Sequence, residues 1–174
     1  MTEMKQASST AKQRITFERH YKGATVADVW ELWTTKEGIE EWWGPDGFSV
    51  KVHELDLRVG GRLDYAMTAT ELPQVEFMKK AGMSVTTQHR GTFKEVEPQS
   101  RLAFVFPMDF VPGLAEPYSV ETTVEMFPTA DGVRLVVTID PMHDAHWTDM
   151  AVQGWEMELG RLERSLEKRL AQGS

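Results

Sequence analysis

The sequence predicts an α+β fold in which a curved antiparallel sheet of about seven strands wraps around one long C-terminal helix. Three observations predict it. Strand-like stretches follow one another through the middle of the chain, two short amphipathic stretches follow the first of them, and residues 143–170 contain no proline. Strands that cluster together, rather than alternating with helices, are typical of an antiparallel sheet with its helices set apart.

The long C-terminal helix is predicted from the spacing of its apolar residues. Trp155, Leu159, Leu162, Leu166 and Leu170 follow one another at steps of three or four residues. This is the spacing of one face of an α-helix. A helix of this length spans roughly 40 Å, so its apolar face needs a large partner surface. A sheet is the large candidate upstream.

The chain before the sheet contains the two short helices. Residues 14–21 alternate between apolar and polar side chains and predict a first strand. Thr25 and Asp28 then have the spacing of a capping box, which starts a helix. Thr35 is expected to cap a second short helix, which the Gly44-Pro45 pair ends.

From Phe48 onward the apolar period changes to two, which predicts six further strands. These are expected at residues 48–53, 62–67, 90–96, 101–108, 118–127 and 132–139. Residues 70–88 interrupt the alternation, and within them residues 74–83 could form a turn or two of helix ending at Gly82. Long insertions between strands often serve as lids or binding loops.

The length and composition indicate one domain and exclude several classes of protein. We expect a disordered leader at residues 1–12 and a single domain at 13–172, with an insertion at 70–88. The 174 residues include no cysteine, which excludes disulfides and thiolate chemistry. The net charge of −8 argues against nucleic-acid and anionic-membrane partners. No apolar run is long enough to span a membrane, and a cytoplasmic location is predicted.

Several motifs resemble those of a known family. They are the Val29-Trp30-Glu31-Leu32-Trp33-Thr34 stretch, the Trp42-Trp43-Gly44-Pro45 tetrad, the Asp56–Arg62 segment and the Gly154-Trp155 pair. Together they resemble the START/Bet v 1-like (SRPBCC) superfamily, and more narrowly the bacterial single-domain relatives of the activator of the heat-shock protein 90 ATPase (AHSA1 type). The resemblance covers residues 13–170. It implies the helix-grip fold, with a cavity between sheet and helix that binds hydrophobic or amphipathic small molecules.

The cavity wall is expected on the inward faces of the strands. The predicted ligand-binding residues are Phe48, Tyr65, Met67, Phe104, Phe106 and Tyr118, with Trp43 and Trp147 near the helix ends of the cavity. Tyr65 and Tyr118 are the expected polar contacts. The alternative is that these aromatic side chains simply fill a close-packed core.

The sequence is consistent with three alternative functions. The first is a non-enzymatic binding protein for a hydrophobic small molecule. The second is a polyketide-cyclase- or hydrolase-like enzyme that uses the same cavity, and the third is a chaperone-associated interaction module. The sequence contains no recognisable catalytic dyad, nucleophile elbow, phosphate loop or dinucleotide fingerprint. No catalytic residue and no cofactor are therefore predicted, and the binding function is preferred.

The start of the long helix offers a cluster of potential metal ligands, namely Asp140, His143, Asp144, His146 and Asp149. Two histidines and a carboxylate could hold zinc. However, the spacing matches no zinc-hydrolase motif, and Asp140 or Asp144 could instead cap the helix. No metal site is predicted.

The face of this helix opposite the leucines carries Met150 and Met157. An outer helix face is normally polar. Either the 70–88 insertion or a partner could therefore cover these methionines, and a homodimer contact is a hypothesis.

Overall fold

The computed structural model describes residues 13–108 and 116–173, and it confirms the α+β helix-grip fold. The predicted leader, residues 1–12, lies outside the described residues. The elements in chain order are β1 (Ile15–Lys22), α2 (Val26–Thr34), α3 (Lys36–Trp42), β2 (Phe48–Leu55), β3 (Arg62–Ala69), α4 (Leu72–Lys80), β4 (Thr86–Glu97), β5 (Arg101–Met108), β6 (Tyr118–Pro128), β7 (Gly132–Ile139) and α5 (Ala145–Gly173).

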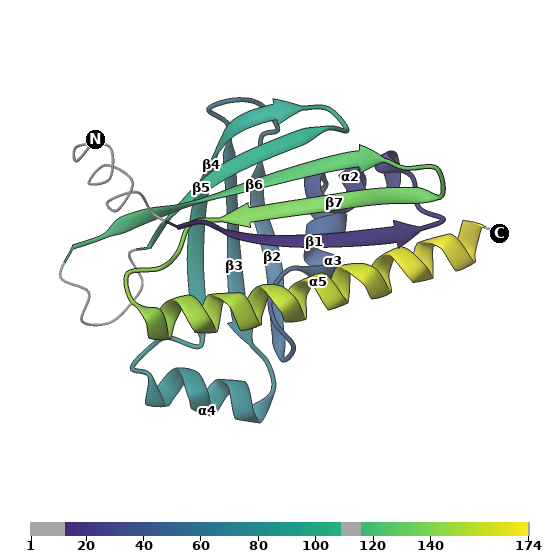
Figure 1. Cartoon of the computed structure of the whole chain (residues 1–174). Helices are drawn as coiled ribbons and strands as arrows, with labels where there is room; N and C mark the ends of the chain where they lie inside the picture. Colours follow the sequence, from purple (N-terminus) through teal and green to yellow (C-terminus); the bar gives the residue numbers. More distant parts are fainter. Residues whose placement is uncertain (1–12, 109–115, 174) are drawn as a thin grey trace, which may run out of the picture.

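The strands of the described chain form one seven-stranded antiparallel sheet in the order β1-β7-β6-β5-β4-β3-β2. Neighbours in the sheet are neighbours in sequence, except at one end. There β1 pairs with β7, and Ile15 lies opposite Ile139. The sheet is strongly curved, and α5 crosses its open side (Figure 1).

Helices α2 and α3 begin where the sequence predicts. The Thr25 side chain accepts a hydrogen bond from the Asp28 N–H, and the Asp28 side chain accepts one from the Thr25 N–H. Thr35 caps α3 in the same way, accepting from the Gly38 N–H at 3.0 Å. Such caps satisfy backbone donors that the first turn of a helix leaves free.

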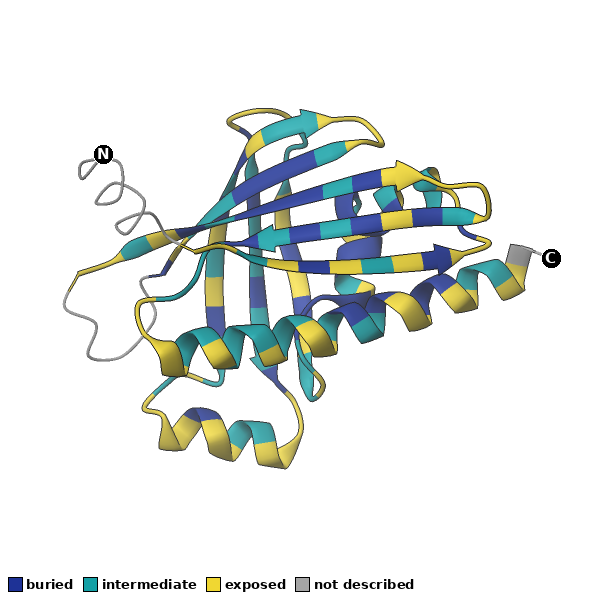
Figure 2. Ribbon diagram, in the orientation of Figure 1, coloured by how far each residue is buried: buried dark blue, intermediate teal, exposed yellow. Residues whose placement is uncertain are grey.

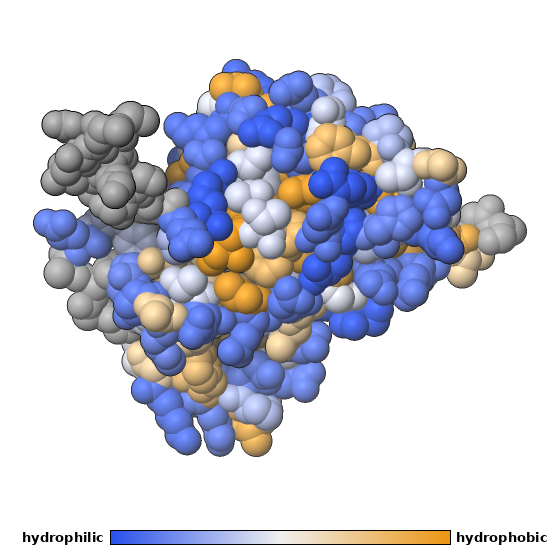
Figure 3. All heavy atoms as spheres, in the orientation of Figure 1, coloured by the Kyte–Doolittle hydropathy of each residue, from blue (hydrophilic) through white to orange (hydrophobic). Residues whose placement is uncertain are grey.

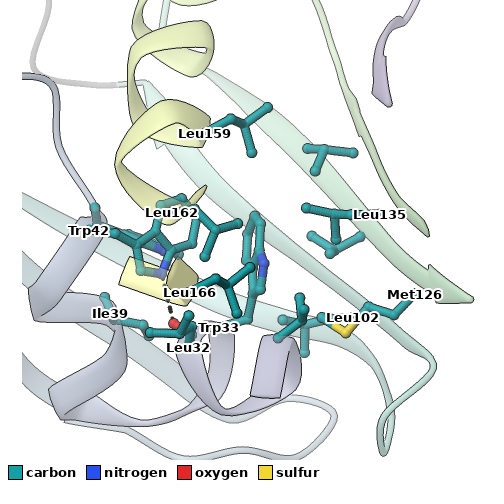
Figure 4. Packing of buried hydrophobic residues seen from close by; sticks show 14 of the residues in the cluster. Leu32, Trp33, Ile39, Trp42, Leu102, Met126, Leu135, Leu159, Leu162 and Leu166 are labelled. Atoms are coloured by element: carbon teal, nitrogen blue, oxygen red, sulfur yellow. Dashed lines mark hydrogen bonds between the residues drawn. The ribbon is translucent and has the colours of Figure 1, made fainter. Parts of the chain in front are cut away.

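The solid part of the core lies under the C-terminal half of α5. There Leu159, Leu162 and Leu166 pack with residues of α2, α3 and the sheet (Figure 4). The Trp42 Nε1–H donates a 2.8 Å hydrogen bond to the Leu32 carbonyl, which joins α3 to α2 inside this cluster. The predicted leucine face of the long helix is therefore confirmed as core.

The start of α5 is fixed by one of the two predicted caps. The Asp144 carboxylate accepts a 2.8 Å hydrogen bond from the Trp147 N–H. Asp140 instead accepts from the backbone N–H of Glu121 and pairs with Arg14, so it ties the chain end of β7 to the sheet. The helix begins at Ala145, two residues after the expected His143.

The insertion differs from its prediction in extent. Helix α4 begins at Leu72 and is followed by Gly82 at φ +74°, but strand β4 already begins at Thr86 rather than at Arg90. Thr86, Thr87 and His89 lack an apolar alternation, yet they pair with β3, which the local pattern cannot indicate. Helix α4 is mostly exposed (Figure 2), and Met78 is its buried residue.

Most of the face in Figure 3 is hydrophilic, with hydrophobic residues gathered near its centre. None of the helices in residues 13–108 and 116–173 combines the length and hydrophobicity that a membrane span needs.

Candidate functional site

A cavity of about 290 Å³ separates the N-terminal half of α5 from the sheet. Its walls come from the segment after α3, from strands β3 to β6 and from α5. The described lining residues are Trp43, Gly44, Pro45, Tyr65, Met67, His89, Phe104, Phe106, Met108, Val120, Thr122, Met142, Trp147, Met150, Ala151, Gly154, Trp155 and Glu158. The same helix therefore covers a solid core with one half and a hollow with the other.

Six of the eight residues predicted from the sequence line this cavity: Trp43, Tyr65, Met67, Phe104, Phe106 and Trp147. Phe48 and Tyr118 are not among the described lining residues. Phe48 begins β2, which is the edge strand beyond β3. The Tyr118 hydroxyl is hydrogen-bonded to His143 Nδ1 at 2.8 Å and accepts from the His143 N–H. That hydroxyl therefore fixes the position of the segment that leads into α5. The ligand-binding role of all eight residues stays a prediction.

Helix α5 contributes its lining residues from one face. Trp147, Met150, Ala151, Gly154, Trp155 and Glu158 follow at helical spacing and continue into the leucine face. At Gly154 an added Cβ would meet no atom within 4 Å, so this glycine leaves open space in the cavity floor.

The methionines of α5 are arranged differently from the prediction. Met150 lines the cavity, so neither the insertion nor a partner is needed to cover it. Met157 is 42% exposed, and its sulfur accepts a 3.1 Å hydrogen bond from the Asp46 N–H. No α4 residue is among the described lining residues. The homodimer contact stays a prediction, which light scattering would test.

The site contains a carboxylate that the sequence analysis missed. Glu158 lines the cavity on α5, next to the segment that follows α3. Burial raises its pKa to about 7, although a hydrogen bond from the Gly44 N–H and the charge of Arg161 act in the opposite direction. Arg161 itself donates to the carbonyls of Gly44 at 2.6 Å and Pro45 at 3.2 Å, which holds that segment against the helix.

Two further polar side chains lie on the sheet side of the cavity. The Tyr65 ring stacks on the His89 ring with centroids 4.8 Å apart, and His89 Nε2 shares a 2.8 Å hydrogen bond with Thr87 Oγ1. Burial raises the pKa of the Tyr65 hydroxyl far above its usual range, and the negative charge of Glu158 raises it further. Tyr65 and Glu158 therefore lie close enough to influence each other electrostatically across the cavity.

Glu158 gives a prediction about stability and pH. The carboxyl of the unfolded chain loses its proton near pH 4.5, whereas the folded protein keeps it to about pH 7. The folded state binds more protons between these values, so this group lowers the free energy of unfolding as the pH rises through them. We expect Glu158→Gln to match the wild type near pH 4.5 and to exceed its stability at about pH 8, by on the order of 1–3 kcal/mol.

Thermal or urea unfolding at the two pH values measures this difference. Glu167→Gln is the control, because it removes the same charge from an exposed position on the same helix. Its effect on the free energy of unfolding should be equal at both pH values. Identical stabilities of wild type and Glu158→Gln at about pH 8 would contradict the expectation.

The potential metal ligands near the start of α5 do not come together among the described residues. Asp140 and Asp144 are engaged as described above, and His143 bonds to Tyr118. No group of three or more His, Cys, Asp or Glu side chains in the described part of the chain has the arrangement to hold a metal ion.

Known proteins share the fold. A crystal structure of a protein from Chromobacterium violaceum superposes with a TM-score of 0.72 at 22% sequence identity, covering 89% of this chain and 98% of that one. The solution structure of an AHSA1-like protein from Aeromonas hydrophila has a TM-score of 0.68 and 24% identity, covering 90% and 94%. At these identities the likeness shows the fold alone. No curated protein sequence matches the chain.

The family is shown by a match along most of the chain. The family model described as Activator of Hsp90 ATPase homolog 1-like protein matches residues 23–167. This range runs from the turn after β1 to near the end of α5 and includes every described residue of the cavity wall. The chain therefore belongs to the family of proteins like the activator of Hsp90 ATPase homolog 1, within the Bet v 1/START-like (SRPBCC) superfamily.

Proposed function

We propose that this protein binds one small, largely apolar molecule in the cavity between β3–β6 and α5. The observation that carries this proposal is a hollow of about 290 Å³ with a largely apolar wall between the sheet and α5. Ligand pockets typically measure about 300–1,000 Å³, so the expected ligand is small. The AHSA1-like fold supports a ligand-binding protein of this superfamily.

The chemistry of the wall supports an apolar ligand. Indole, phenyl and thioether groups provide most of the surface, including Trp43, Phe106 and Met150. Aromatic side chains bury large apolar areas, and thioethers adapt to irregular shapes. An apolar wall offers few hydrogen-bond partners to water and is therefore favourable for an apolar guest.

A few polar groups would orient that guest. Tyr65, Thr122 and Glu158 enter the cavity from β3, β6 and α5. Polar groups on three separate elements can fix one orientation of a ligand, since each hydrogen bond restricts a different direction. The expected ligand is therefore amphipathic, with at least one polar or charged group.

The enzyme alternative has one observation in its favour. A carboxyl group with a pKa of about 7, near a tyrosine and inside an apolar cavity, has the properties of a general acid–base. Binding remains the preferred function because the described lining offers no nucleophile with an adjacent base, and proton transfer by Glu158 would itself require the bound molecule.

Native mass spectrometry of the protein purified without denaturation tests the binding function. We expect a single non-covalent adduct that is lost on denaturation. Tryptophan fluorescence gives a second readout, because Trp43, Trp147 and Trp155 line the cavity. A panel of small apolar and amphipathic molecules should include some that change the fluorescence in a saturable way with one site per chain.

Trp30→Phe is the control for the fluorescence, since Trp30 is not a lining residue and its replacement should leave the ligand-dependent change intact. Trp155→Phe should diminish it. A mass without adduct, together with no saturable response across the panel, would overturn the proposed function. A bound molecule converted into one of different mass would favour the enzyme alternative.

A further inference from the structure

The carboxylate in the cavity wall is not balanced by a lysine or arginine of the described wall. Glu158 is the carboxylate among the described lining residues, and no lysine or arginine is among them. Glu158 is half-buried, and a carboxylate that is partly withdrawn from water is costly unless a positive or hydrogen-bonding partner compensates it. The nature of the ligand therefore depends on how far the protein itself compensates Glu158.

The protein compensates Glu158 only in part. The Gly44 N–H bonds to its carboxylate, and Arg161 attracts it. The Arg161 guanidinium, however, donates to the carbonyls of Gly44 and Pro45 and is not among the described lining residues. A molecule in the cavity therefore meets the carboxylate of Glu158 rather than the guanidinium behind it.

The aromatic side chains around Glu158 add a second feature. Tyr65 and Trp43 meet edge to face at 5.2 Å, and Phe104 and Phe106 lie within 6.4 Å of Trp43, centroid to centroid. Trp155 lies one helical turn before Glu158 and also lines the cavity. Faces of tryptophan and tyrosine attract cations, most strongly where water is excluded.

Resting on the proposed binding function, we propose that the preferred ligand is a small organic cation, an amphipathic amine or quaternary ammonium compound. Its charged nitrogen lies beside the Glu158 carboxylate, and its apolar part packs among Trp43, Phe106 and Trp155. An aromatic wall with one carboxylate matches such a ligand in both charge and polarity.

A neutral hydrogen-bond acceptor, such as a ketone, is the competing class. It would bind to the protonated form of Glu158, so its affinity would fall as the pH rises through about 7. A permanent cation requires the ionised form, and its affinity would rise over the same range. The two classes therefore give opposite pH dependences.

The experiment compares two probes of the same shape. Benzyltrimethylammonium carries a permanent charge, and neopentylbenzene is its uncharged carbon isostere. Binding of each to the protein is measured by tryptophan fluorescence at about pH 5.5 and about pH 8. We expect the cation to bind about tenfold more tightly than the isostere at the higher pH, and by a smaller factor at the lower.

Glu158→Gln should remove most of the preference for the cation over neopentylbenzene. Glu167→Gln, an exposed change of equal charge on the same helix, should keep the preference. Tyr65, His89 and Arg161 also carry titratable groups at this end of the cavity, and Asp46 pairs with Arg164 nearby. The pH effect is therefore taken as the difference between the wild type and Glu158→Gln.

Each outcome decides one of the two proposals. Equal or tighter binding of neopentylbenzene in the wild type would overturn the cation inference and leave the binding function intact. The cation inference would also be overturned if Glu158→Gln, with its fold verified by circular dichroism, preferred the cation as strongly as the wild type does. If neither probe nor any member of the apolar panel binds, the proposed function is overturned and the cation inference with it.

Discussion

Substitution of Gly154 by phenylalanine is expected to weaken ligand binding about 100-fold or more, equivalent to about 3 kcal/mol. Gly154 lies in the cavity floor, and an added Cβ meets no atom within 4 Å. A phenyl ring at this position can therefore occupy the hollow without displacing the backbone. Glycine in a helix interior also costs about 1 kcal/mol relative to alanine, so we expect no loss of thermal stability.

The measurement is the affinity for any molecule that binds the wild type, together with the unfolding temperature. Gly160→Phe is the matched control, because Gly160 lies on the same helix, has only the Arg164 side chain near its added Cβ and is not a lining residue. It should retain binding. Wild-type affinity in a folded Gly154→Phe protein would show that the ligand site lies elsewhere.

Truncation of Trp42 to alanine is expected to lower the free energy of unfolding by about 3–5 kcal/mol. Trp42 is fully buried among α2, α3 and α5, and its Nε1–H is bonded to the Leu32 carbonyl. Removing the indole leaves a large void and also deprives that carbonyl of its donor, and both effects destabilise the fold.

Urea denaturation of the wild type and the variant measures this effect. Phe77→Ala on α4 is the comparison, since Phe77 is 48% exposed and its loss should change stability by about 0.5 kcal/mol or less. Trp42→Phe, which keeps a ring but loses the hydrogen bond, should fall between the two. Similar losses for Trp42→Ala and Phe77→Ala would contradict the role of Trp42 as a central core residue.

Much of the fold could be predicted from local patterns, because apolar residues recur at regular intervals along its helices and strands. The leucine face of α5 and the alternation in β7 each identify an element and its buried side. The start of β4 was missed because Thr86, Thr87 and His89 are polar and become a strand through pairing with β3. Pairing is a property of the sheet, which a local pattern does not contain.

The sequence predicted only part of the candidate site, because the alternation within a strand is also a local pattern. Strand parity shows which side of a strand faces inward, and it identified Tyr65, Met67, Phe104 and Phe106. It does not show which strands the hollow spans, and Phe48 lies on the edge strand outside the described lining.

Glu158 was missed because a charged residue in an amphipathic helix is usually solvated. One signal could have found it, namely its position one turn after Gly154 and Trp155, on the apolar face of α5. A single acidic residue on the apolar face of a helix indicates a functional site rather than a solvent-exposed surface.

The pairing of β1 with β7 also has a consequence for how the chain is made. Strand β1 is synthesised before the other strands of the described sheet, but its partner β7 lies 110 residues further on at the nearest pair, Lys22 and Gly132. Contacts at such separations form late and slow folding. Until β7 has been made, β1 is an unpaired strand that is open to association with other nascent chains.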